Sequence, residues 1–365
     1  MAAPLKEIFN EAEIRRLAKI ARQADGKFSE SQFIANLINR DWKHLELKQR
    51  MRRVAEELGQ NLKGDFAKQS VALRKIAPQF SGLFGMSFPD YVEVYGKHDP
   101  ELSLELLEFL TPFSSSEFAI RPFLLNEPDL TIRTMMKWSK SKNHHVRRLA
   151  SEGSRPRLPW AMAIPFLKKD PYPILPILYN LRSDKEDYVY RSVANNLNDI
   201  SKDHPAITLR ICKEWKDGPE ETQWVIKHAL RTLLKKGDPA ALKLQGHHHA
   251  APAEIHQLRI SANELIIGTE ISFSCELKNP SSKPHLYRVE YGIDYVKSNG
   301  KTSQKVFQWK KINLRPGESV KLNSKQSLAD MSTRKHYPGV HKLHVLINGK
   351  SLNNKVFKLI NKGKS

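Results

Sequence analysis

The chain has 365 residues, of which 40% are hydrophobic and 8% aromatic, as expected for a folded protein with room for two domains. Sixty basic against 39 acidic residues give a formal net charge of +21, which favours an anionic partner, nucleic acid above acidic lipid. No apolar run reaches 18 residues, the N-terminus lacks a signal-peptide core, and Cys212 and Cys275 lie far apart. We therefore expect a cytoplasmic protein without a membrane span, a disulfide or a cysteine metal site.

The first 110 residues or so alternate amphipathic segments with short polar breaks. Apolar residues at helical spacing predict helices over 12–24, 48–58, 66–76 and 100–110. Another helix is expected over 116–123, interrupted at Pro122. Ser114 and Glu117 have the S-x-x-E spacing of a capping box, so Glu117 is either a helix cap or a functional acid. This region is predicted to be all-α.

Residues 144–161, HHVRRLASEGSRPRLPWA, contain an apolar stripe that predicts a helix ending near Gly153. Its opposite face carries Arg148, Glu152 and Arg155. Glu152 lies in the last turn, where the helix dipole disfavours a carboxylate. It is therefore either a surface acid neutralised by the two arginines or an acid used in chemistry. Trp160 is expected at the opening of the next helix, as a core residue or as a functional ring.

A repeat is visible between about 117 and 245, because residues 189–200 align with 225–236 and, more distantly, with 145–153. Helical units recurring at 36 to 47 residues are typical of HEAT-like solenoids. Asp199 ends one such helix and is either paired with Lys202 or part of a site. The concave face of a solenoid is expected to gather residues at equivalent positions: Arg148, Glu152, Arg191, Asp199, Lys227 and Arg231.

The pattern changes after residue 245. Three consecutive histidines in QGHHHAAP do not easily converge on one ion, so we expect a linker over 246–253 and no metal site. From 254 to 365 apolar residues alternate with polar ones between turn signals, which predicts about seven strands in an immunoglobulin-like sandwich. This segment holds 20 basic and 8 acidic residues. The excess of basic residues either keeps the surface of this domain soluble or serves to clamp nucleic acid. We expect this domain to follow a helical-repeat domain over 1–245.

Four segments resemble a known family: SSSEFAIRPF, HHVRRLASEGSRPRLPWA, VYRSVANNLNDISKDHP and HALRTLLKKGDPAAL. They are similar to the AlkC branch of the HEAT-repeat DNA alkylation-repair glycosylases, which has a C-terminal immunoglobulin-like domain. The resemblance implies monofunctional excision of 3-methyladenine and 3-methylcytosine from DNA, without conventional base flipping and without a cofactor. By motif it assigns catalysis to Glu117, Glu152 and Asp199, and contacts with the damaged DNA to Trp160 and Arg148.

These residue types suit that chemistry. A ring-alkylated base is cationic and leaves without a general acid, whereas the sugar becomes oxocarbenium-like and is stabilised by carboxylates. Two alternatives stay open: a non-catalytic HEAT scaffold that binds nucleic acid, and a protein-interaction adaptor, which the basic sandwich disfavours. We expect a monomer, since one groove and one clamp suffice.

Overall fold

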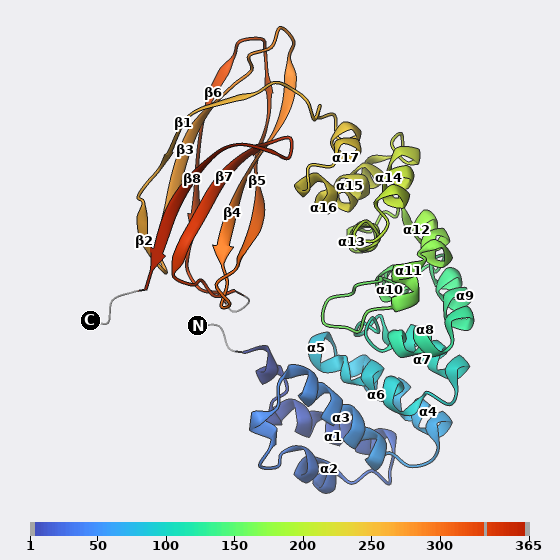
Figure 1. The fold of residues 1–365 in the computed structure, drawn as a ribbon. Coiled ribbons are helices and arrows are strands. Elements are labelled where there is room, and N and C mark those ends of the chain that lie inside the picture. Colours follow the sequence, from blue (N-terminus) through green and yellow to red (C-terminus); the bar gives the residue numbers. More distant parts are fainter. Residues whose placement is uncertain (1–3, 332–333, 362–365) are drawn as a thin grey trace. The chain divides into compact units, whose positions relative to one another are not determined.

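The computed structural model describes residues 4–331 and 334–361, with helices as far as Leu244 and strands from Glu254 onward (Figure 1). The chain forms two compact units. One comprises residues up to 204 together with 217–229, and the other comprises 205–216 together with 230 onward. Three helices thus group with the strands: α14 (Pro205–Glu214), α16 (Arg231–Lys235) and α17 (Pro239–Leu244). The predicted division of the chain into domains stays a prediction, with limits at 1–245, 246–253 and 254–365. Within these ranges, residues 1–3, 332–333 and 362–365 lie outside the described part.

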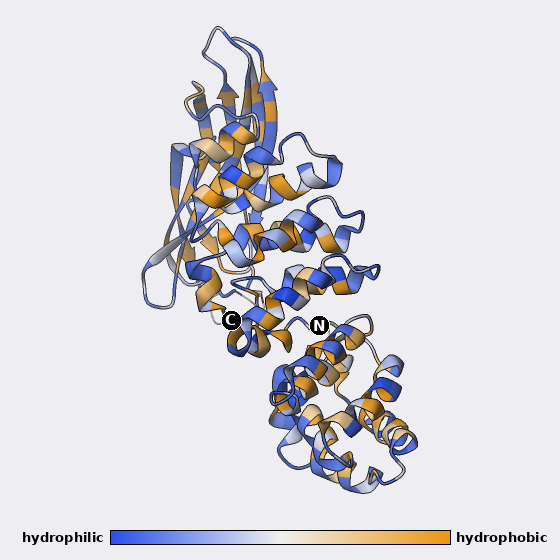
Figure 2. Ribbon diagram, turned by 90° about the vertical axis from the view of Figure 1, so that its right-hand side faces the viewer, coloured by the Kyte–Doolittle hydropathy of each residue, from blue (hydrophilic) through white to orange (hydrophobic). Residues whose placement is uncertain are grey.

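The first unit is a succession of short helices with apolar and polar faces (Figure 2). Its α-helices are α1 (Glu11–Ala24), α2 (Glu30–Leu37), α3 (Leu47–Asn61), α4 (Phe66–Ile76), α5 (Gly82–Gly85), α6 (Ser87–Tyr95), α7 (Pro100–Leu110), α8 (Ile120–Asn126), α9 (Pro128–Trp138), α10 (His144–Gly153), α11 (Pro165–Lys169), α12 (Leu175–Leu181), α13 (Asp187–Ile200) and α15 (Glu220–Ala229). The predicted helices 66–76 and 100–110 coincide with α4 and α7. Asp65 and Asp99 cap them by accepting hydrogen bonds from the backbone N–H groups of Lys68 and Leu102.

Two predicted helices need correction. The one expected over 116–123 begins at Ile120 and continues through Pro122, because a proline in the first turn removes an N–H that has no intrahelical partner. Ser114 is not its cap, since its hydroxyl donates to the Gly82 carbonyl. The helix expected over 225–236 is broken at Leu230, whose ψ of −3° departs from helical geometry.

Helices α10, α13 and α15 form the part of the repeat that positions the site. α13 packs against both α10 and α15, and its buried stripe includes Val189, Val193 and Leu197. On α10, Val146 and Leu149 are buried as the periodicity predicted. Each helix thus buries its apolar stripe on its neighbours, as in a helical-repeat protein.

The strands form two sheets. They are β1 (Glu254–Ile260), β2 (Glu264–Ile266), β3 (Glu270–Lys278), β4 (His285–Val296), β5 (Thr302–Leu314), β6 (Ser319–Ser327), β7 (Gly339–Ile347) and β8 (Lys350–Ile360). The sheet orders are β1-β3-β6 and β2-β8-β7-β4-β5, and all pairs are antiparallel except β2 with β8. Leu277 and Leu322 of one sheet pack with Tyr287 and Val345 of the other. The predicted sandwich is thus present.

Candidate active site

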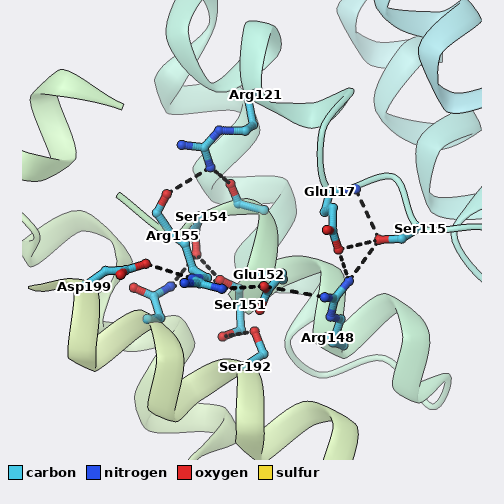
Figure 3. Close-up of polar contacts among 12 residues, drawn as sticks. Ser115, Glu117, Arg121, Arg148, Ser151, Glu152, Ser154, Arg155, Ser192 and Asp199 are labelled. Atoms are coloured by element: carbon cyan, nitrogen blue, oxygen red, sulfur yellow. Dashed lines mark hydrogen bonds and ion pairs between the residues drawn. The ribbon is translucent and has the colours of Figure 1, made fainter. Parts of the chain in front are cut away.

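A chain of alternating acids and bases joins the segment before α8, the C-terminal half of α10 and the end of α13 (Figure 3). Glu117 accepts a hydrogen bond from Arg148. Arg148 Nη2 lies 3.5 Å from Glu152 Oε1, which also accepts from Arg155 Nη1 at 2.6 Å. Arg155 Nε then donates to Asp199 Oδ2 at 2.8 Å. The structure therefore brings the three predicted carboxylates and Arg148 into one network.

Glu152 is only 5% exposed. The alternative of a surface acid is wrong, although neutralisation by Arg148 and Arg155 is confirmed. A buried carboxylate is tolerated when charged partners replace its water shell. The two arginines do so at a helix end that would otherwise disfavour the negative charge.

The three carboxylates differ in how many of their oxygens are occupied. Glu152 accepts its partners through Oε1, and Glu117 accepts from both Arg148 and the Ser115 hydroxyl through Oε2. The second oxygen of each accepts no hydrogen bond from any residue that the structure describes. On Asp199, Arg155 occupies Oδ2 and Lys202 occupies Oδ1 at 2.9 Å, so the predicted pairing with Lys202 is also present. Glu117 and Glu152 therefore offer acceptor atoms to a ligand more directly than Asp199 does.

The arginines stay cationic. Burial lowers the pKa of Arg148, but the charges of Glu152 and Glu117 outweigh it and raise that pKa above its ordinary value. The pKa of Arg155 is raised in the same way, against its burial, by Glu152 and Asp199. The Arg148 guanidinium also lies 4.6 Å from the centre of the Tyr188 ring. Arg148 and Arg155 therefore place positive charges at fixed positions next to the carboxylates.

Buried polar side chains fix α13 against α10. The Ser192 hydroxyl donates to the Ser151 hydroxyl at 2.9 Å, and Asn196 Nδ2 donates to the Ser151 carbonyl at 2.8 Å and to the Ser154 hydroxyl at 3.2 Å. These bonds hold the Asp199 helix in register with the Glu152 helix. None of these residues was predicted from the sequence. Their signal is the i, i+4 spacing of Ser192 and Asn196 on the buried side of a helix.

Trp160 is 66% exposed, so its assignment to the core is wrong. It does not open a helix either, because α11 begins only at Pro165. The Ala161 N–H donates to the Leu158 carbonyl, and Trp160 has a φ of 63°. With Pro159 before it, this is the pattern of a type II turn, whose third position normally takes glycine. The left-handed backbone at a bulky residue costs about 1–3 kcal/mol, so the surrounding structure must hold it.

Other predictions have mixed outcomes. Of the six residues expected to share a groove, Arg148, Glu152 and Asp199 belong to the network, whereas Arg191 pairs with Asp187 on its own helix. Among the described residues, no group of three or more histidines, cysteines or acids is arranged to hold a metal ion. His247 is buried instead, with Nδ1 3.2 Å from the Leu286 carbonyl.

The cysteines are free and buried. Burial raises the pKa of Cys212 to about 12 and that of Cys275 to about 11, so neither is a thiolate nucleophile near neutral pH. In the part of the chain that the structure describes, every helix is too short or too polar to cross a membrane.

Comparisons with known proteins agree with this architecture. A family model described as "Uncharacterised protein YhaZ, C-terminal Ig-like domain" matches residues 254–361, which confirms the immunoglobulin-like character of the sandwich. The chain is 47% identical to "Uncharacterized protein YhaZ" of Bacillus subtilis (strain 168), over 95% of its length and 97% of that protein. A solved structure, Pseudomonas fluorescens alkylpurine DNA glycosylase AlkC bound to DNA containing an abasic site analog, superposes with a TM-score of 0.94 at 39% identity. That match covers 98% of this chain and all of AlkC. The chain therefore belongs to the protein family that includes AlkC and YhaZ.

Proposed function

We propose that the protein is a monofunctional DNA glycosylase that hydrolyses the N-glycosidic bond of cationic alkylated bases in double-stranded DNA. The observation that carries the proposal is the carboxylate network. Glu117 and Glu152 each keep one oxygen without a hydrogen bond from the described residues. Arg148 and Arg155 balance the negative charge of this site. Family membership supports the same conclusion, since AlkC is an alkylpurine DNA glycosylase bound to DNA containing an abasic site analog.

The arrangement suits a cationic leaving group. Methylation at a ring nitrogen puts a positive charge on adenine or cytosine, so the base departs without protonation. The sugar left behind develops positive charge at C1′, which an ionised carboxylate stabilises while it orients the attacking water. The Glu152 oxygen, at the centre of the network, is proposed for this role, and the Glu117 oxygen attracts the cationic base.

Asp199 contributes in two ways. Through Oδ2 it holds Arg155, which in turn holds Glu152. Its other oxygen pairs with Lys202, whose side chain is 40% exposed and can be exchanged for a cation on the substrate. Asp199 is therefore retained among the proposed catalytic residues, and Arg148 and exposed Trp160 among those that contact the damaged DNA.

The proposed substrates are 3-methyladenine and 3-methylcytosine in DNA. An exposed tryptophan ring can stack on a base or sugar that is not enclosed in a pocket, which supports excision without conventional base flipping. The basic sandwich is proposed to hold the phosphates of the duplex, which compensates for the acids in the site. A monomer without a cofactor is sufficient for this scheme.

The test is release of the base from a duplex oligonucleotide with one 3-methylcytosine or, after alkylation, 3-methyladenine. Wild type is expected to release it, and Asp199→Asn to release it at least about tenfold more slowly. Duplex affinity should stay equal or rise slightly in the variant, because a negative charge is removed. A wild-type protein that binds the duplex and releases no base would instead be a non-catalytic nucleic-acid scaffold.

A further inference from the structure

The Trp160 ring is carried by a short loop that is closed at its base. The Ile164 N–H donates to the Pro156 carbonyl at 3.1 Å, so the backbone between them forms a compact excursion. Arg121 secures both ends. Its Nη1 donates to the carbonyls of Gly153 and Arg155 at 3.0 and 2.9 Å (Figure 3). Its Nε donates to the Met162 carbonyl at 2.6 Å.

Arg121 is fully buried. Its burial, reinforced by repulsion from Arg155, lowers its pKa to about 10, so the guanidinium still carries its charge at neutral pH. The charge faces carbonyls at the C-terminal end of α10, where the helix dipole favours a cation. The base of the loop is thus rigidly attached to the helix that carries Glu152.

The tip of the loop is held by a residue distant in the sequence. Lys48 Nζ donates to the Trp160 carbonyl at 2.5 Å and lies 4.5 Å from the centre of the Phe118 ring. Lys48 is in the first turn of α3, where the helix dipole disfavours a cation. A lysine at that position has an electrostatic cost that its contact with the loop offsets.

The loop has room to relax once the hydrogen bond from Lys48 is removed. Lys48, Phe118, Ala161 and Met162 border one pocket of about 480 Å³. The left-handed backbone at Trp160 is unfavourable for a bulky residue. Without the bond to its carbonyl, the backbone of Trp160 can rotate about the N–Cα bond toward a negative φ, and the ring would change direction with it.

We propose that Lys48 is a positioning residue that holds the Trp160 carbonyl and so fixes the direction of the exposed ring. For its effect on excision the inference rests on the proposed function. Its effect on the loop is independent of any activity. When the Trp160 ring is already fixed in the free protein, binding of DNA does not have to supply the entropic cost of ordering the loop.

The first experiment is hydrogen exchange on the full-length protein, with Lys48→Met compared with Arg53→Gln. Arg53 is a matched control because it is a cation on the same helix and borders the same pocket. The Ala161 amide, next to Trp160, is expected to exchange at least about tenfold faster in Lys48→Met and at the wild-type rate in Arg53→Gln. Unchanged exchange in Lys48→Met would overturn the proposal, whether or not the protein releases a base.

The second experiment measures single-turnover excision and duplex affinity separately. Lys48→Met should lower the excision rate about tenfold, Lys48→Arg should restore most of it, and duplex affinity should fall no more than in Arg53→Gln. In a Trp160→Ala background Lys48→Met should have no further effect on the rate. An equal loss in both backgrounds, or none in either, would overturn the positioning role. If the wild-type protein releases no base, the proposed function is refuted. The hydrogen-exchange result then still tests whether Lys48 holds the loop.

Discussion

Buried charges occur in both units, but their surroundings differ. In the helical repeat, Glu117 and Glu152 retain 16% and 7% of their side-chain exposure and are paired with arginines. In the sandwich, Glu290 on β4 accepts from Arg288 Nη2 at 2.6 Å, and its side chain is completely buried. Its Oε2 also accepts no hydrogen bond from the described residues. An unoccupied carboxylate oxygen therefore indicates a site only where a ligand can reach it.

The electrostatic environments differ as well. Burial raises the pKa of Glu290, although Arg288 and Lys235 oppose that shift. At the site, by contrast, three bases alternate with three acids: Glu152 and Asp199 each pair with two bases, and Glu117 pairs with Arg148. We interpret the Arg288–Glu290 pair as structural and the network as functional. Substitutions at equivalent points of the two clusters separate these roles.

The largest effect is expected from Glu152→Gln. Loss of the central negative charge should lower single-turnover excision by at least about tenfold, because the oxocarbenium-like sugar loses its nearest stabilising charge. Duplex affinity should stay equal or rise slightly. Quantified base release and a binding titration check this, with circular dichroism as the control for folding. A parallel loss of binding and folding would mean that Glu152 is structural, like Glu290.

Glu290→Gln should have the opposite profile. It leaves the buried Arg288 without its anion, which is expected to cost about 3 kcal/mol of unfolding free energy, while excision per folded molecule stays at the wild-type level. Denaturant unfolding and base release on the same preparation provide the measurement. A variant of wild-type stability that no longer excises would show that the distinction between the two clusters is wrong.

A third test asks whether the sandwich holds DNA. β5 lies at the edge of its sheet, where exposed lysines either discourage aggregation or contact phosphate. Replacing Lys305 and Lys310 on β5, and Lys301 just before it, by glutamine should weaken duplex binding. The slope of log affinity against log salt concentration should become shallower by about 0.9 for each phosphate that is no longer neutralised. The readout is the slope of log affinity against log salt concentration. An unchanged slope would indicate that these lysines only keep the edge soluble.

The smallest effect concerns pH. Burial lowers the pKa of His247 and of His341, both in the second unit, below the ordinary 6.5. Below that value the unfolded chain binds protons that the folded chain does not, so stability should fall as the pH drops. Thermal unfolding at about pH 7.5 and about pH 5.5 tests this, and Glu152→Gln should show the same dependence as wild type. Greater stability at the lower pH would contradict the assignment of both histidines as buried and neutral.

The sequence predicts the fold well where periodicity is strong. The apolar stripes of α4, α7 and α10 place those helices correctly, and alternation after residue 254 predicts the sandwich strands. The errors lie where local signals conflict. Pro122 is predicted to interrupt a helix, although it belongs to a first turn. Trp160, which follows Leu158 and Pro159, is predicted at a helix start, although these residues belong to a turn in a loop that has no periodicity of its own.

The fold class follows from the sequence alone, because side-chain periodicity is a local property, whereas the site residues stay a prediction that rests on the resemblance of their motifs. Tertiary structure decided that Glu152 is buried, that Arg155 joins it to Asp199, and that Trp160 is exposed. It also decided the roles of Arg121 and Lys48, whose partners lie up to 41 and 112 residues away. No local pattern specifies such pairs, since a hydrogen bond between distant residues depends on how packed helices bring their ends together.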